Sequence, residues 1–222
     1  MEQLVNLSKK LPNKKLLTYV EKRIKRIEDL GFKVTLVDVP RILEDGRHYG
    51  GWFSEDLKEL KVAVGQKWEK WFPIFVHETC HFDQWLEKCL EWKIVQNVYR
   101  KQSAHEVFFN WLQKKKYSDD VVFRAIEAVR TNELDCERRV AKELINNNLN
   151  ALIDVSIINK QANAYIYFYN VMYFTRKWYH KDFRPYKVKK LWNMMPDHFN
   201  NDYTQLPIDY YRQCVKHCYK KK

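Results

Sequence analysis

Glycine and proline are scarce in this sequence, with 5 and 6 copies among 222 residues. Their scarcity excludes collagen-like and low-complexity chains and disfavours a turn-rich all-β sandwich. The sequence also lacks any apolar run near the roughly 20 residues that a membrane span needs. The first residues, Met1 to Pro12, contain no apolar segment of signal-peptide length. We therefore expect a soluble, cytoplasmic protein that has no membrane partner.

Cysteines are few, and their number is odd. The five are Cys80, Cys89, Cys136, Cys214 and Cys218, and their spacing matches no disulfide framework. Cys214 and Cys218 lie one helical turn apart with His217 between them, but two or three soft ligands do not close a structural zinc site. We interpret the five cysteines as buried or free thiols of an intracellular protein.

Positive charge exceeds negative charge by a wide margin, with 40 Lys and Arg against 28 Asp and Glu, a net charge of +12. A basic surface favours anionic partners such as nucleic acid or an acidic protein surface. Apolar residues make up 45% of the chain and aromatic residues 15%, which is enough for a sizeable core and argues against intrinsic disorder. The length suits one domain, or a core domain with a helical extension.

Hydrophobic periodicity divides the chain into a helix, three strands and then helices only. The first helix covers 15–30 and ends at Gly31, and the strands cover 33–39, 49–54 and 57–64 around a polar loop at 40–48. Later helices are expected at 68–92 with Pro73 in the first turn, at 103–116 with a Ser103–Glu106 capping box, and at 118–146, 156–180, 185–195 and 207–219. Strands followed by helices indicate an α+β fold. We predict a domain at 1–150 and a helical C-terminal extension at 151–222, packed on the same core.

One segment carries recognisable chemistry: His77-Glu78-Thr79-Cys80-His81, which is H-E-x-x-H on a predicted helix. The four-residue spacing places both imidazoles on one helix face, where they can share one zinc ion. Glu78 follows the first histidine and can take a proton from a water held by the metal. Apolar neighbours at Phe75 and Val76 suggest that the histidines lie near a core.

A zinc ion held this way needs a third protein ligand, and the segment Asn132-Glu133-Leu134-Asp135-Cys136-Glu137 offers carboxylates. With the H-E-x-x-H segment, it resembles the zincin metallopeptidases, and among them the gluzincins, which include thermolysin. In that group a second helix supplies the third ligand from an N-E-x-x-x-D pattern. The resemblance implies Glu133 as the third zinc ligand and Glu137, in place of the usual Asp, as the acceptor that orients a ligand histidine.

Other interpretations of this segment stay open. Glu137, Asp135 or His105 could be the third ligand instead of Glu133. Alternatively, Glu133 and Glu137 could belong to a solvated helix face, paired with Arg130, Arg138 or Lys142.

The resemblance covers residues of about 15 to 145 and implies a minimal zincin-like fold: a helix, a short three-stranded twisted sheet, the H-E-x-x-H helix and the glutamate helix. In the family, an edge strand, here 57–64, holds the substrate backbone by strand addition. Zincins also use a Tyr or His to stabilise the developing oxyanion, and Tyr165, Tyr169 and His180 are available without a sign that selects one. Most aromatic residues of the last third have helical spacing that indicates core positions.

Two functions follow. The first is a zinc-dependent peptide-bond hydrolase with a peptide or protein substrate, in which Glu78 activates water. The alternative is a basic nucleic-acid-associated or interaction protein with a structural or vestigial metal site. A di-iron protein would need a second E-x-x-H segment, and no histidine other than His81 has a glutamate three residues before it.

Overall fold

The computed structural model describes residues 6–44, 46–180 and 183–219. The chain forms two compact units. Unit 1 combines Met1–Glu87 with Lys142–Ile153, and unit 2 combines Lys88–Ala141 with Asp154–Lys222. Helices and strands occur in the order helix, small sheets, then mostly helices, which confirms the α+β class. In the residues that the structure describes, no helix has the length and hydrophobicity that a membrane span requires.

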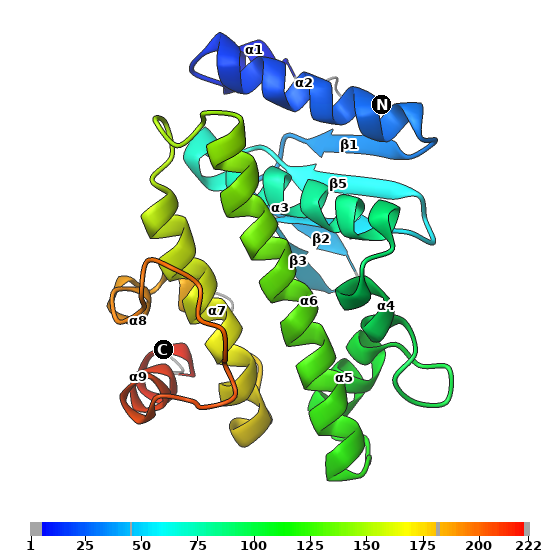
Figure 1. Cartoon of the computed structure of the whole chain (residues 1–222), viewed down its shortest axis with the longest axis vertical. Coiled ribbons are helices and arrows are strands. Elements are labelled where there is room, and N and C mark those ends of the chain that lie inside the picture. The colour runs from blue at the N-terminus through cyan, green and yellow to red at the C-terminus, as the bar shows by residue number, and fades with distance from the viewer. Residues whose placement is uncertain (1–5, 45, 181–182, 220–222) are drawn as a thin grey trace. The chain divides into compact units, whose positions relative to one another are not determined.

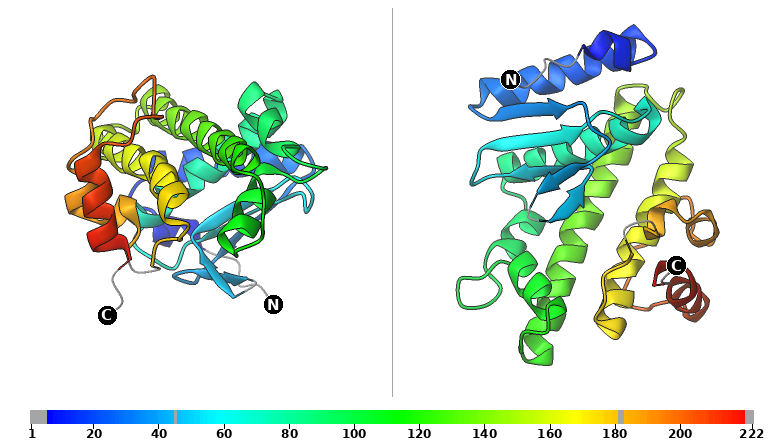
Figure 2. Two further views of the ribbon diagram at one scale, coloured as in Figure 1. Left: turned by 90° about the horizontal axis from the view of Figure 1, so that it is seen from below. Right: turned by 180° about the vertical axis from the view of Figure 1, so that it is seen from behind.

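Unit 1 begins with a short helix, α1 (Leu7–Lys10), and the longer α2 (Lys14–Asp29), which confirms the first predicted helix. The side chain of Asn13 caps α2 by accepting from the backbone N–H of Leu16. Gly31 follows the helix with φ of +82°, a conformation that costs a glycine little. The apolar face of α2 is buried, and α2 runs alongside β1 (Figures 1 and 2).

The main sheet of unit 1 has three strands, β1 (Lys33–Val37), β4 (Gly51–Ser54) and β5 (Glu59–Ala63), in the order β1-β5-β4. β5 pairs in parallel with β1 and antiparallel with β4. The prediction that the strand at 57–64 is the edge strand is therefore wrong, because β5 has a hydrogen-bonded neighbour on each side. β1 and β4 are the edges.

A second, two-stranded sheet replaces the polar loop predicted at 40–48. β2 (Ile42–Glu44) and β3 (Arg47–Tyr49) pair as an antiparallel hairpin. Gly46 has φ of +72° in the connection, and Ile42 is the apolar residue of β2 that is buried. Strands of three residues are too short to show a period of two. The polar composition of the segment therefore indicates a loop.

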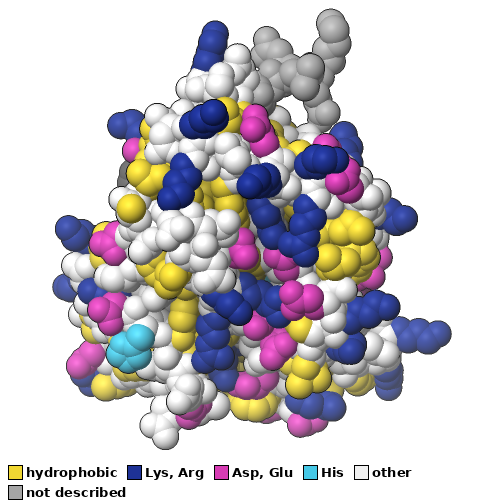
Figure 3. Space-filling view, turned by 45° about the horizontal axis from the view of Figure 1, so that its top comes forward, with side chains coloured by type: hydrophobic (Ala, Val, Ile, Leu, Met, Phe, Trp, Pro, Cys, Tyr) yellow, Lys and Arg dark blue, Asp and Glu magenta, His cyan; other side chains and the backbone are white. Residues whose placement is uncertain are grey.

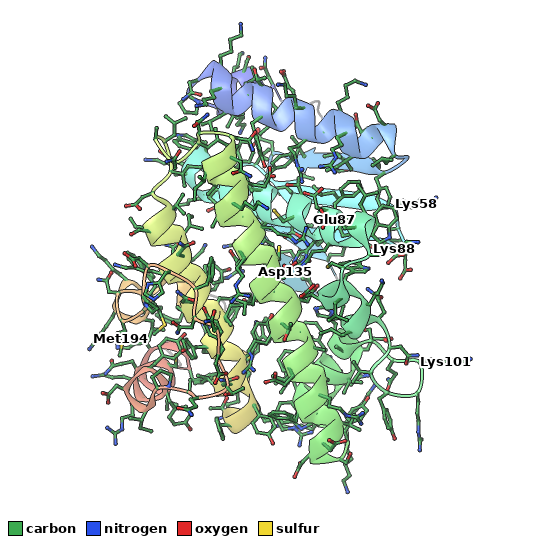
Figure 4. All side chains as sticks on the ribbon, viewed as in Figure 1. Lys58, Glu87, Lys88, Lys101, Asp135 and Met194 are labelled. Atoms are coloured by element: carbon green, nitrogen blue, oxygen red, sulfur yellow. The ribbon has the colours of Figure 1, made fainter. Side chains whose placement is uncertain are left out.

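The next helix, α3 (Trp68–Glu87), is largely buried and packs on β4 and β5. The prediction of Pro73 in the first turn is wrong, because α3 begins at Trp68 and Pro73 lies in its second turn. The predicted helix at 68–92 is also interrupted. Lys88 has φ of +50°, and a separate helix, α4 (Leu90–Gln96), follows the Glu87–Lys88 corner (Figure 4).

Unit 2 is helical. Its elements are α4, α5 (Ala104–Leu112), most of α6 (Asp119–Asn146), α7 (Val155–Thr175), the 3₁₀ turn η1 (Pro185–Lys187), α8 (Lys189–Trp192) and α9 (Ile208–Cys218). Ser103 and Glu106 form the predicted capping box. The helix predicted at 156–180 ends earlier, at Thr175, where Arg176 has φ of +48°. Only η1 and α8 occupy the helix predicted at 185–195.

The core of unit 2 joins residues of α5, α6, α7 and α9. Tyr167, Phe168 and Tyr169 of α7 are buried in it, as their helical spacing predicted, whereas Phe174 is exposed. A buried polar contact also holds α6 to the following segments, because Arg130 donates to the side chain of Asn170 and to the carbonyl oxygen of Tyr203. The long helices α6 and α7 are thus held together by both apolar and polar contacts.

Candidate metal centre

The H-E-x-x-H segment lies on a helix, α3, as predicted, and this helix belongs to unit 1. Thr79 and Cys80 are fully buried, while His77 and His81 are half-buried on another face of the helix. The buried face of α3 is aromatic and anchors the helix: Phe82 packs edge-on against Phe32 and Phe53. Burial of one face therefore fixes the direction in which the two histidines point.

The two imidazoles converge on each other. Nε2 of His77 and Nε2 of His81 are 3.1 Å apart, and the ring planes are at 88°. Two imidazole nitrogens on one tetrahedral zinc, at the usual Zn–N distance of about 2.0–2.1 Å, are about 3.3–3.4 Å apart. The observed separation is close to this value, so the side chains of His77 and His81 fit a shared zinc ion with little rearrangement.

Gln84 sets the tautomer of His81. Nδ1 of His81 lies 2.7 Å from Oε1 of Gln84, a fully buried amide one turn further along α3. An amide oxygen only accepts hydrogen bonds, so the contact places the proton of His81 on Nδ1. The lone pair of Nε2 then faces the point where the two rings meet. Metal-ligating histidines typically have such a partner on the other ring nitrogen.

Glu78 is 8% exposed and lies against the sheet. A Cβ atom on Gly51, the first residue of β4, would be 3.1 Å from Cγ of Glu78 and 2.9 Å from the carbonyl oxygen of Lys61. The absence of a side chain at Gly51 therefore lets the edge strand β4 approach α3 at the position of Glu78. The sheet edge and the candidate base lie side by side.

The two other predicted site residues, Glu133 and Glu137, lie on α6 in unit 2. Glu133 is 9% exposed and Glu137 is half-buried. Burial raises the pKa of both Tyr165 and Tyr169 on α7, and the charge of Glu133 adds to the increase at each hydroxyl. The hydroxyl of Tyr169 donates to that of Tyr165 over 3.0 Å. Glu133 therefore lies in a tyrosine-lined part of unit 2.

Asp135, Cys89 and Glu91 form a second group of possible metal ligands. Asp135, midway along α6 (Figure 4), forms an ion pair with Arg139 at 2.6 Å. It also brings a carboxylate oxygen within 4.8 Å of the ligand atoms of Cys89 and Glu91. Burial raises the pKa of the Cys89 thiol, which disfavours the thiolate that a metal would need.

His105, Cys214 and Cys218 are further candidates for metal binding. Burial lowers the pKa of His105 to about 4. Cys214 and Cys218 are fully buried, and burial raises the pKa of the Cys214 thiol. Within the described residues, Cys214, His217 and Cys218 do not bring three ligand atoms together, and the five cysteines form no disulfide there.

Comparison with protein-family models, with curated proteins and with solved structures finds no match to this chain. The candidate site therefore rests on the residues themselves. The structure brings His77 and His81 together, whereas Glu133 and Glu137 as ligand and orienting residue stay predictions. Sequence reasoning missed Gln84, although its position three residues after His81 on a helix was a usable sign. It also missed Cys136, which shares the helix face of Glu133 and Glu137.

Proposed function

We propose that the protein is a zinc-dependent peptide-bond hydrolase with a minimal zincin-like catalytic domain. The observation that carries the proposal is the convergence of Nε2 of His77 and Nε2 of His81 at 3.1 Å. A separation of 3.1 Å also suits a hydrogen bond between the two rings, so the convergence supports the proposal through its combination with other features of the site. Here the convergence is combined with an orienting amide and an adjacent, buried carboxylate.

The donor set suits zinc. Two neutral imidazoles and one carboxylate, with a fourth position open, are the usual protein ligands of catalytic zinc. His77 and His81 would hold the ion, and Glu133 is our proposed third ligand, with Glu137 orienting a ligand histidine. When bound, zinc would supply a Lewis acid that makes water easier to deprotonate and polarises the substrate carbonyl.

Glu78 is the proposed general base. As a side chain that follows the first ligand and is not itself a ligand, it can accept the proton of the attacking water and pass it to the leaving amine. Its low exposure keeps bulk water away from the carboxylate, so that proton transfer is directed to the reacting molecule. The peptide carbonyl becomes a carboxylate, and the amine leaves with the transferred proton.

The sheet edge suggests how a substrate would be held. β4 is an edge strand of the three-stranded sheet and contacts α3 at Glu78 through Gly51. An extended peptide can add to such an edge by backbone hydrogen bonds. We propose β4 for this role instead of 57–64, because β5 is a central strand.

Metal content and hydrolysis together test the proposal. The purified protein should contain about one zinc per chain by elemental analysis, and His77→Ala should contain almost none. Glu78→Gln should keep zinc but lose hydrolysis of an unfolded protein substrate, because an amide cannot accept the proton of the water. Full hydrolysis by Glu78→Gln would exclude Glu78 as the base. A metal-free wild-type protein that cannot be loaded with zinc would leave the nucleic-acid-associated or interaction protein as the better hypothesis.

A further inference from the structure

A basic groove lies along α2 within unit 1, and its lining does not include the histidines of α3. The groove is a cavity of about 640 Å³, and its lining consists of Lys14, Lys15, Thr18, Tyr19, Lys22, Arg23, Arg26, Glu143, Asn147 and Leu149. Figure 3, in which the α2 side of Figure 1 is turned forward, shows Lys and Arg side chains on this part of the surface. We refer to this cavity as the α2 groove.

The cations of the α2 groove follow one helix face. Residues 14, 15, 18, 19, 22, 23 and 26 recur at intervals of three or four, with neighbours beside them, as expected for a single stripe on a helix. Lys14 and Arg26 are 12 positions apart, or about 18 Å along the helix axis. The positive charge is therefore spread along a line, and it matches an elongated anion better than a single small one.

The groove lining contains few acidic groups, and they already form hydrogen bonds within the protein. Glu143 is the one carboxylate in its lining. It accepts a hydrogen bond from the hydroxyl of Tyr19 at 3.1 Å and from the side-chain amide of Asn147 at 3.3 Å. These bonds hold Glu143 in place without cancelling the charges of the lysines.

The cations of the groove differ in their capacity to bind an anion, because Arg23 and Arg26 form ion pairs with Asp83. Lys14 and Lys22 have no ion-pair partner among the residues that the structure describes. Arg23 is 7% exposed and lines the groove, and its Nε–H has no acceptor in the described part of the chain. A buried donor without an acceptor is costly, and a ligand oxygen in the groove would relieve that cost.

We propose that the α2 groove binds a strand of nucleic acid through its phosphodiester backbone. A single strand presents negative charges at regular intervals, and a positively charged groove can follow it without reading its sequence. The lining contains one aromatic residue, Tyr19, and that residue is buried. Binding should therefore depend on charge and show little base preference. The net charge of +12 adds attraction at long range.

The full-length protein can be tested by fluorescence anisotropy with a labelled 20-nucleotide single-stranded DNA of mixed sequence. The variant is Lys14→Gln/Lys22→Gln, because both side chains are exposed and neither forms an ion pair among the described residues. The control, Lys189→Gln/Lys190→Gln, removes the same charge from two exposed lysines of α8. EDTA in the buffer separates this test from the metal site, because binding in the groove requires neither zinc nor Glu78.

Loss of two phosphate contacts should weaken binding by roughly tenfold at about 0.1 M salt and reduce the slope of log K against log salt by about 1.4. The control should change affinity less than twofold. Absence of DNA binding, or equal weakening by variant and control, would overturn the proposal. Inorganic pyrophosphate and vesicles of phosphatidylcholine with phosphatidylserine are tested in parallel. If binding of pyrophosphate or of the vesicles depended on Lys14 and Lys22 while DNA binding did not, the groove would be assigned to small phosphates or to lipid headgroups instead.

Discussion

Arg23 of α2 donates a hydrogen bond from Nη2 to the carbonyl oxygen of Thr79, at 2.8 Å, in the middle of the H-E-x-x-H segment. The same nitrogen donates to Oδ2 of Asp83 at 2.5 Å. Both side chains of this ion pair are nearly buried. One guanidinium thus ties α2 to the helix that carries the two histidines and the candidate base, and it also lines the α2 groove.

The first prediction concerns this tie. Arg23→Ala should lower the free energy of unfolding by about 3 kcal/mol, because it leaves the nearly buried Asp83 carboxylate with the exposed Arg26, 3.0 Å away, as its remaining ion-pair partner among the described residues. Urea unfolding measures the change. Lys25→Ala is the control, since Lys25 pairs with Asp29 on the exposed side of the same helix, and its loss should cost less than about 1 kcal/mol. Equal losses in both variants would show that the Arg23–Asp83 pair does not hold the two helices together.

The second prediction concerns Gln84. Gln84→Leu removes the acceptor for Nδ1 of His81, which should weaken zinc binding by about 10- to 100-fold without abolishing it. Gln84→Glu keeps an acceptor and should bind zinc at least as well as Gln84→Leu does, and better if the carboxylate takes the position of the amide. Competitive titration against a chelator measures the affinities. Unchanged affinity in Gln84→Leu would mean that the tautomer of His81 does not depend on this bond.

The third prediction concerns pH. Burial lowers the pKa of His105 on α5 to about 4, whereas an unfolded histidine has a pKa near 6.5. Between these values the unfolded chain binds a proton that the folded chain does not, so the free energy of unfolding falls as the pH drops from about 6.5 to 4. At pH 5 the loss from this residue is about 2 kcal/mol. Above pH 6.5 and below pH 4, His105 causes no further change in the free energy of unfolding.

Two variants isolate that effect. His105→Gln should lose about 2 kcal/mol less than the wild type between pH 7 and pH 5, because it has no proton to gain. His198→Gln, which changes an exposed histidine, should follow the wild type. Urea unfolding at the two pH values measures all three proteins. If His105→Gln were as sensitive to acid as the wild type, His105 would already accept a proton in the folded state.

The sequence predicted the local features of this protein better than its long-range contacts. The periodicity of α2 and α6 and the capping box of α5 lie within one helix each and were predicted correctly. The prediction of 57–64 as the edge strand was wrong, because the parallel pairing of Lys33 with Glu59 depends on chain segments far apart. The same division holds at the site. The spacing of His77 and His81 is local and could be read from the sequence. The hydrogen bond from Arg23 to Thr79 joins residues 56 positions apart, and no sequence pattern predicts it.

The last prediction concerns the third zinc ligand, which α6 should supply. Glu133, Cys136 and Glu137 share one face of that helix, and Cys136 is fully buried. If Glu133 is the ligand, Glu133→Ala should lose most zinc, because a two-histidine site does not close a tetrahedral set. Glu137→Ala should weaken zinc binding by about 10- to 100-fold, as expected for a residue that orients a ligand. Glu137→Asp, which restores the usual family residue, should be milder.

Cys136→Ser separates the carboxylate from the thiolate hypothesis, and Asp120→Ala, which removes an exposed carboxylate from the first turn of α6, is the control. With Glu133 as the ligand, Cys136→Ser and Asp120→Ala should both keep zinc. Loss of zinc in Cys136→Ser with retention in Glu133→Ala would define a two-histidine, one-cysteine site and end the gluzincin assignment. A greater loss in Glu137→Ala than in Glu133→Ala would exchange the roles of the two glutamates. Retention of zinc in all of these variants would place the third ligand elsewhere, with His105 and Asp135 next to be substituted.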